Sequence, residues 1–232
     1  MRTKIIIEDH VVPQLLTSAI ESYEMGLKAT SKSAAKLKLE VYGLLWGYPL
    51  SPRADLPTRL VATMATVETS AVRHQDWVQP NYESIRMKRD FFKTFWPQLE
   101  LIGTFHSHPY DRLSEVNEQK GWRASGEDGD KGHWPDMHQR IFHDAHELAH
   151  LIITITQLER KGTAWQERLP GNESKSGVVF SAERRKFWFK AYTTQRREVA
   201  SVDRDTPSRL EYVVNEEVEF NVPSLDQFCA KY

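Results

Sequence analysis

Cysteine is almost absent from this 232-residue chain, and the single Cys229 has no partner for an internal disulfide. This excludes a disulfide-stapled extracellular scaffold and a zinc site built from cysteines. An excess of one charge is also absent, because 31 basic residues face 32 acidic ones, so nothing indicates nucleic-acid binding. No apolar run is long enough to span a bilayer, and the one near the start is too short for a signal peptide. We therefore expect a cytoplasmic protein with no nucleic acid or membrane among its partners.

What is present is the composition of a folded domain, with 40% apolar and 27% charged residues. The apolar patterning predicts strands and helices that alternate as far as residue 158, with further strands after it. Residues 110–134 are polar and predict a long irregular excursion, and residues 30–35 a linker. The predicted strands are 4–8, 37–47, 60–67, 99–105, 148–156, 178–181, 186–193 and 212–222, and the predicted helices follow Asp9 and Asn81 and cover 136–147.

A His-Ser-His-Pro sequence at 106–109 follows one of these strands. Side chains two residues apart share a face of a strand, so His106 and His108 point to the same side. Two imidazoles at a strand end can supply two ligands of a tetrahedral zinc site, which also needs a third ligand and an open position for water. Taken alone, the pair fits a metal site and two surface histidines equally well.

Two acidic segments add to this pair. Glu40 opens an apolar segment, where a carboxylate is costly unless it meets a cation, a proton or a metal-bound water. Ser125-Gly-Glu-Asp128 offers a further carboxylate and a hydroxyl that could donate to a developing oxyanion. Taken singly, the first segment indicates a salt bridge at a strand end, and the second a turn or a helix cap.

Together, three segments resemble the JAMM (MPN-plus) family of zinc metalloproteases: Glu-x-x-Gly-Leu-Leu-x-Gly at 40–47, His-Ser-His-Pro at 106–109 and Ser-x-x-Asp at 125–128. The similarity covers residues 1–158. It implies an α/β (α+β) fold, a mixed β-sheet flanked by helices, with an MPN/cytidine-deaminase-like catalytic domain in residues 1–158. Residues 159–232 would form a C-terminal β-rich extension packed on the same domain.

The resemblance also implies a chemistry. In this family two histidines and an aspartate bind one zinc ion, and they match His106, His108 and Asp128. We expect Glu40 to act as the general base and Ser125 to stabilise the oxyanion. The implied activity is that of a deubiquitinase-like isopeptidase, which cleaves an isopeptide or peptide bond and removes ubiquitin or a ubiquitin-like modifier from a target. The implied partners are a ubiquitin-like protein or its conjugates, and the activating and conjugating enzymes of the same pathway.

The third metal ligand has a rival in the sequence. The family's spacer is shorter and its helix begins directly at the aspartate, whereas two glycines and a proline follow Asp128 before the predicted helix. Asp136 lies at the start of that helix, but choosing it would put His133 in the place of the serine. Asp128 is preferred because it brings Ser125 with it, and both aspartates stay open.

Two other functions compete with this interpretation. His-Glu-x-x-His at 146–150 is the zinc-binding motif of zincin proteases if it lies on one helix, with its histidines one turn apart. The β-branched run 151–156 favours a strand there, so a helix end with surface histidines is the preferred interpretation. The other competitor is a catalytically inactive, MPN-type scaffold of the same fold, which binds partner proteins without a metal.

Overall fold

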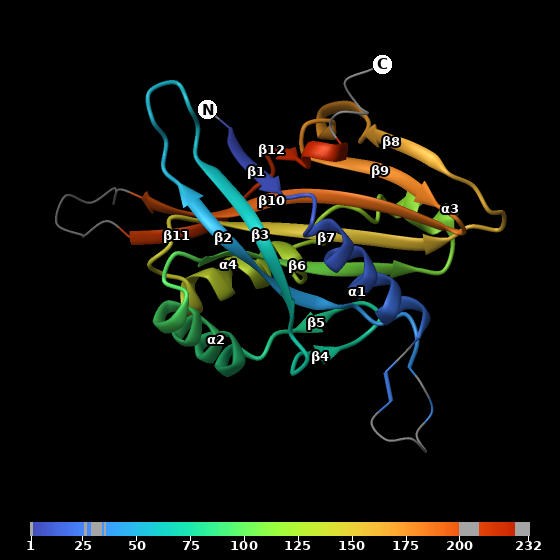
Figure 1. The fold of residues 1–232 in the computed structure, drawn as a ribbon, viewed down its shortest axis with the longest axis horizontal. Helices are drawn as coiled ribbons and strands as arrows, with labels where there is room; N and C mark the ends of the chain where they lie inside the picture. The colour runs from blue at the N-terminus through green and yellow to red at the C-terminus, as the bar shows by residue number, and fades with distance from the viewer. Residues whose placement is uncertain (1, 26, 29–33, 35, 200–208, 226–232) are drawn as a thin grey trace.

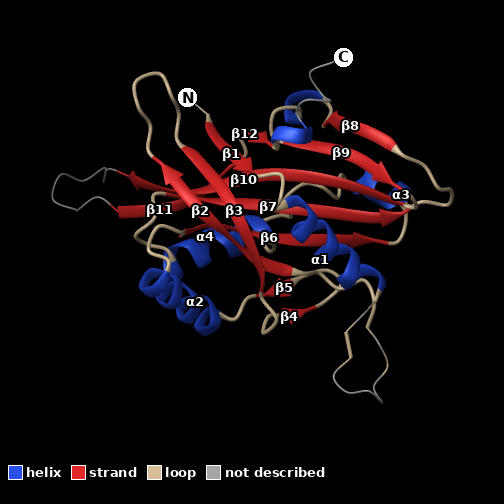
Figure 2. Ribbon diagram, viewed as in Figure 1, coloured by secondary structure: helices blue, strands red, loops and turns tan. Residues whose placement is uncertain are grey.

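The structure is a computed structural model that describes residues 2–25, 27–28, 34, 36–199 and 209–225. The predicted linker at 30–35 lies outside the described residues, apart from Ala34. Four α-helices, one short 3-10 helix and twelve strands make up the described part of the chain (Figures 1 and 2). In chain order they are β1 (Thr3–Ile7), α1 (Val12–Glu24), β2 (Tyr42–Leu50), β3 (Arg59–Val67), β4 (Val72–Arg73), β5 (Val78–Gln79), α2 (Tyr82–Phe95), β6 (Glu100–Tyr110), α3 (Leu113–Gln119), α4 (Asp130–Ile141), β7 (Glu147–Gln157), β8 (Ala164–Arg168), η1 (Gly171–Glu173), β9 (Gly177–Ala182), β10 (Arg185–Val199), β11 (Arg209–Asn215) and β12 (Val218–Asn221).

Ten of the strands form one mixed sheet in the order β12-β1-β3-β2-β6-β7-β10-β9-β8, with β11 paired to β10. Strand β1 runs parallel to both of its neighbours, and β6 runs parallel to β7. Figure 1 shows β2 and β3 crossing the long β6, β7 and β10 at a steep angle, because the twist accumulates from strand to strand. The sheet therefore curls into a half-barrel. No helix among the described residues is both long and apolar enough to cross a membrane.

The predicted fold class is wrong. The α/β (α+β) prediction, with helices flanking an MPN/cytidine-deaminase-like sheet, gives way to a mostly β structure. A curled sheet needs fewer helices, because side chains on its inner face reach one another across the curl. Ile5 of β1, Ile153 of β7, Phe189 of β10 and Phe220 of β12 accordingly share one buried cluster, to which α1 contributes Leu15. The strands of residues 159–232 extend this same sheet.

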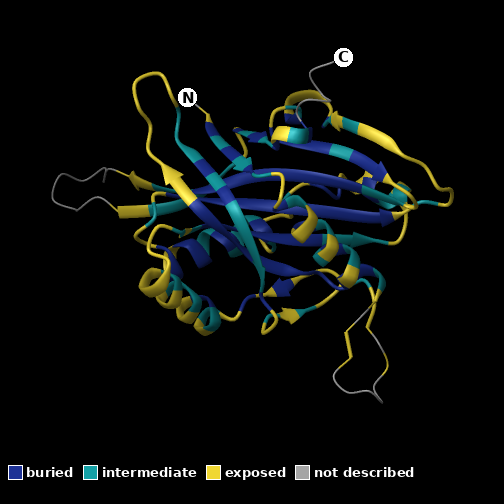
Figure 3. Ribbon diagram, viewed as in Figure 1, coloured by how far each residue is buried: buried dark blue, intermediate teal, exposed yellow. Residues whose placement is uncertain are grey.

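The opposite face of the sheet carries a second buried cluster. Trp46 of β2, Ile85 of α2, and Trp134 and Met137 of α4 pack there with Tyr192 of β10. Figure 3 shows the long central strands buried, while α1 and α2 expose their outer sides. Strands β7 and β10 are thus covered on both faces. This explains why the sequence of β7 is a nearly continuous apolar run.

Several local predictions are confirmed. Asn81 caps α2, since its side chain accepts hydrogen bonds from the backbone N–H groups of Glu83 and Ser84. The β-branched run after residue 148 is a strand, β7. The strand predicted at 99–105 is longer than expected: β6 continues through the histidines and Pro109, which is paired with Ile155 of β7. The missing N–H of Pro109 is tolerated because the ladder of β6 with β2 ends at His106.

The predicted excursion at 110–134 is wrong. It contains α3 and the first turn of α4, which begins at Asp130 rather than near Asp136. Pro135 lies inside α4, and the helix continues through it. The first turn of α4 is stabilised by a residue that precedes the helix, because the backbone N–H and the hydroxyl oxygen of Ser125 both form hydrogen bonds with Asp130. Local helix propensity alone could not reveal that anchor.

Candidate metal centre

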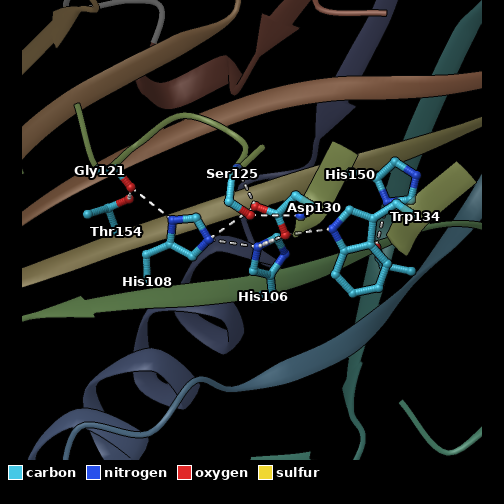
Figure 4. Close-up of polar contacts among 9 residues, drawn as sticks. His106, His108, Gly121, Ser125, Asp130, Trp134, His150 and Thr154 are labelled. Atoms are coloured by element: carbon cyan, nitrogen blue, oxygen red, sulfur yellow. Dashed lines mark hydrogen bonds and ion pairs between the residues drawn. The ribbon is translucent and has the colours of Figure 1, made fainter. Parts of the chain in front are cut away.

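Two histidines of β6 and the first residue of α4 meet at one point (Figure 4). His106 Nε2 lies 3.0 Å from His108 Nε2 and 3.1 Å from Asp130 Oδ1. His108 Nε2 lies 3.4 Å from Asp130 Oδ2. His106 and His108 reach this point together because alternate residues of a strand share a face. Three metal-ligand atoms of the type His-His-Asp therefore converge from two elements.

The separations of these atoms suit a tetrahedral metal ion. Donor atoms bonded to one zinc at about 2.0–2.1 Å lie about 3.3 Å apart, close to the three distances between these side chains. Two imidazoles and a carboxylate are also a donor set that zinc accepts, with one position left for water. His106 is 1% exposed and Asp130 8%, so both ligands lie below the surface. The residues fit a metal ion of this class.

The second nitrogen of His108 is fixed from behind. Its Nδ1 lies 2.9 Å from the Gly121 carbonyl oxygen, which can only accept, so Nδ1 carries the proton and donates it. Thr154 of β7 donates its hydroxyl to the same carbonyl at 3.0 Å. Figure 4 shows the opposite side of the His108 ring directed at Asp130. This hydrogen bond leaves Nε2 as the nitrogen of His108 that can bind a metal.

The carboxylate of Asp130 is oriented by two hydrogen-bond donors. The backbone N–H of Ser125 donates to Oδ2 at 2.9 Å, and Trp134 donates its indole N–H to Oδ1 at 2.9 Å. In return, the backbone N–H of Asp130 donates to Ser125 Oγ at 2.7 Å. A side chain at position 129 would collide with this pair, because a Cβ on Gly129 would lie 2.2 Å from Ser125 Oγ. Asp130 is thus held in one orientation before any ligand binds.

The charges at this point are strongly coupled. Burial lowers the pKa of His106, so its imidazole is neutral near pH 7. Burial also opposes the charged form of His108, but Asp130 and Glu40 outweigh it and raise the pKa of His108 to about 9. The two histidines likewise outweigh the burial of Asp130 and hold its pKa well below the usual range. The arrangement favours positive charge at this point, which a proton or a metal cation can supply.

His108 and Asp130 line a cleft whose volume is about 670 Å³, and Glu40 lies in its wall. Its side chain is 5% exposed, and burial raises the pKa of the carboxyl to about 8, against the lowering effect of His108. Ser107 holds this stretch of chain in place: its Oγ accepts the N–H of Val41, and its own N–H donates to the Val41 carbonyl. The structure therefore sets an acidic group with a perturbed pKa beside three metal-ligand side chains.

The structure brings most of the predicted site residues together. His108, Glu40 and Ser125 line one cleft, and the buried His106 joins His108 and Asp130 in the group of three. The predicted third ligand, Asp128, lines the same cleft but lies outside that group. Asp130, which the sequence analysis missed, takes that place. The signal was present in the resemblance, since the family's helix begins directly at its aspartate and α4 begins at Asp130. The rival Asp136 lies further along α4 and pairs with Arg140 at 2.8 Å.

The His-Glu-x-x-His sequence lies at the start of a strand. Residues from Glu147 onward belong to β7, so the one-turn spacing that a zincin helix requires does not form. His150 is fully buried and bonds to Thr104 Oγ1 at 2.8 Å and Thr194 Oγ1 at 2.9 Å. The prediction of a surface histidine is therefore wrong for His150, although His146 is exposed.

Comparison with known proteins adds no further identification: no protein-family model and no curated protein matches the sequence.

Proposed function

We propose that this chain is a zinc-dependent hydrolase that cleaves an isopeptide or peptide bond and removes ubiquitin or a ubiquitin-like modifier from a target. The observation that carries the proposal is the meeting of His106, His108 and Asp130 beside the buried carboxyl of Glu40. The reaction class comes from the resemblance to JAMM metalloproteases, whose motifs match the segments 40–47, 106–109 and 125–128. The proposal includes a cytoplasmic location, in keeping with the single cysteine, and conjugates of a ubiquitin-like protein as partners.

His106 and His108 would hold the zinc ion through their Nε2 atoms, and Asp130 through its carboxylate. When bound, zinc supplies Lewis acidity, which lowers the pKa of water to about 7 and polarises a carbonyl oxygen. The Gly121 carbonyl keeps His108 in the tautomer that binds a metal, and Ser125 with Trp134 keeps Asp130 oriented. These contacts mean that the ligands need little rearrangement on binding.

Glu40 is the group that would move the proton. Its carboxylate takes a proton from the attacking water as the bond from oxygen to the carbonyl carbon forms. It then gives the proton to the amine nitrogen as the carbon–nitrogen bond breaks. A pKa of about 8 in the metal-free cleft would fall toward neutrality beside a cation, which suits a group that both accepts and donates near pH 7.

Ser125 would stabilise the negative oxygen of the tetrahedral intermediate. Its Oγ accepts the backbone N–H of Asp130, so the hydroxyl proton is left to donate into the cleft that Ser125 lines. The acidic side chain of Asp128 lies on the same wall, outside the ligand group. We assign it no part in the chemistry, which makes it the natural control.

The test combines metal content with isopeptidase assays. Purified protein should contain about one zinc per chain, and zinc-replete protein should cleave isopeptide-linked di-ubiquitin or a fluorogenic amide of a ubiquitin-like protein. Glu40→Gln should keep the metal and lose activity, whereas His108→Ala should lose both, and Asp128→Asn should change neither. Full activity of Glu40→Gln would contradict the mechanism. Zinc-free protein whose stability does not rise on adding zinc would favour the scaffold interpretation.

A further inference from the structure

The long spacer between the metal-ligand histidines and Asp130 is packed on strands from the far end of the chain. Val116 of α3 and Trp122 form a small buried cluster with Leu169 and with Trp188 of β10. The rings of Trp122 and Trp188 stack, with centroids 6.1 Å apart and planes 11° from parallel. Residues 159–232 therefore contact the segment that joins the two halves of the proposed site.

One buried carboxylate in that region binds the spacer directly. Glu173, at the end of η1, is 6% exposed and accepts the indole N–H of Trp122 at 3.2 Å. Its two oxygens also accept from Nε and Nη2 of Arg123 at 3.0 and 3.1 Å, a bidentate pair. Lys190 of β10 lies 3.4 Å from the same carboxylate and donates to Ser176 Oγ at 2.6 Å. Glu173 thus joins two spacer side chains to β10 through charged hydrogen bonds.

The residues that Glu173 holds stand next to those that orient the metal ligands. Gly121, whose carbonyl accepts from His108 Nδ1, directly precedes Trp122. Ser125, which bonds twice to Asp130, follows Arg123 by two residues. A shift of the 121–125 segment would therefore disturb a hydrogen bond behind His108 and the orientation of Asp130 together.

We propose that Glu173 is a positioning residue of the metal centre: by holding Trp122 and Arg123 it sets the carbonyl behind His108 and the serine beside Asp130. This inference rests on the proposed function only in that a metal ion is bound there. It gives the C-terminal part of the chain a role in the site, since Glu173 of η1 and Lys190 of β10 lie in residues 159–232. It also explains why a spacer of this length forms ordered structure between the ligands.

The test compares Glu173→Gln with variants that leave the segment untouched. The NH₂ group of the amide would face the N–H donors of Trp122, Arg123 and Lys190, with which it cannot form hydrogen bonds. These contacts should therefore be lost. We expect zinc affinity, measured by chelator competition, to fall about tenfold, as it does when partners of metal ligands are lost. Cobalt-substituted protein should show an altered visible spectrum. In metal-free protein, amide hydrogen exchange over residues 120–130 should quicken.

Three further variants separate positioning from general destabilisation. Arg123→Ala removes the bidentate pair, and because this side chain is 42% exposed the variant should fold. Like Glu173→Gln, it should weaken zinc binding. Glu167→Gln, at an exposed position of β8, should match the wild type. Val178→Ala, in the core on β9, should lower stability without changing the cobalt spectrum.

The inference fails if Glu173→Gln and Arg123→Ala keep both the zinc affinity and the exchange rates of Glu167→Gln. It also fails if Val178→Ala reproduces their spectral change, because the effect would then be one of stability alone. A wild-type protein that binds zinc but cleaves no isopeptide would contradict the proposed function and leave this comparison intact. The two proposals therefore stand or fall on separate measurements.

Discussion

Ser125 and Asp130 are joined by two reciprocal hydrogen bonds, from the Ser125 N–H to Oδ2 at 2.9 Å and from the Asp130 N–H to Oγ at 2.7 Å. This exchange closes the start of α4 against the loop before it and aims the carboxylate at His106 and His108. The distance between the serine and the aspartate along the chain is two residues greater than in a Ser-x-x-Asp sequence. The geometry therefore depends on the loop conformation at 126–129 as much as on the residue types.

The first prediction concerns the identity of the third ligand. Asp130→Asn should lower zinc affinity by at least about 100-fold, because it replaces an anionic ligand with a neutral amide. Asp128→Asn should bind zinc as the wild type does. Zinc content after dialysis and chelator competition are the measurements. Equal losses in both variants, or a loss in Asp128→Asn alone, would restore Asp128 as the ligand.

The second prediction concerns the hydroxyl of Ser125. Ser125→Ala keeps the backbone bond to Oδ2 but removes the acceptor of the Asp130 N–H and the proposed oxyanion donor. We expect kcat to fall about 10²–10³-fold, the loss typical of removing one oxyanion donor. Zinc affinity should fall less than it does in Asp130→Asn. A change in KM with kcat preserved would assign the hydroxyl to substrate binding and not to the transition state.

The third prediction concerns pH and a buried chain of hydrogen bonds behind the site. The Ala145 carbonyl can only accept, so His138 Nε2 must donate to it, and Thr194 must then donate to His138 Nδ1. Thr194 in turn accepts from Nε2 of His150, whose Nδ1 accepts from Thr104. These contacts fix the tautomer of each imidazole in its neutral form. Burial, which is the main cause, lowers the pKa of His138 to about 4 and that of His150 well below its usual value.

The sign of the resulting pH dependence follows from proton binding. Between pH 6.5 and 4 the unfolded chain binds a proton at position 138 that the folded chain does not, so stability falls as the pH falls through this window. His138 alone should account for about 3 kcal/mol. Urea unfolding at pH 6.5 and at about pH 4 measures the loss, which His138→Gln should reduce. His143→Gln, at an exposed position, should leave the dependence unchanged.

The fourth prediction concerns the close approach of β2 and β3. A Cβ on Gly47 would lie 1.8 Å from the backbone oxygen of Val61, at a point where the pairing register shifts. Because a backbone cannot move aside as a flexible side chain can, Gly47→Ala should destabilise the protein by about 1–3 kcal/mol. Gly162→Ala, which meets nothing within 4 Å, is the matched control. Similar unfolding midpoints for the two variants would contradict the packing shown between β2 and β3.

Much of the candidate site could be predicted from local sequence. The alternation of side chains on a strand places His106 and His108 on one face, whatever the surrounding fold. A carboxylate at the start of an apolar segment indicated that Glu40 would need a cation, a proton or a metal-bound water, and the structure buries it near His108. The third ligand could not be predicted in this way, because Gly129, Gly132 and Pro135 suggested a helix start near Asp136. That interpretation counts local helix breakers and takes no account of tertiary packing, in which Trp134 is buried in the core.

The fold was harder to predict for a different reason. The strands of 4–8, 60–67 and 148–156 were recognisable, but how far a sheet curls depends on twist summed over many strands and on pairings between distant segments. Strand β1 lies between β3 and β12, whose residues are separated by about half the chain or more. No local pattern encodes such pairings. The expected helix-flanked sheet came from the resemblance to the JAMM (MPN-plus) family.

The sequence by itself determined the chemical types at the site: two imidazoles on one strand, a buried glutamate, and an acidic loop ahead of a helix. These follow from residue identity and from the two-residue period of a strand. Only the tertiary structure decided that Asp130 meets the histidines and that Glu173, from the distant C-terminal part of the chain, bonds to the loop between them. The physical reason is that each of these contacts is formed between elements far apart in the chain, whose approach is set by the packing of the whole sheet.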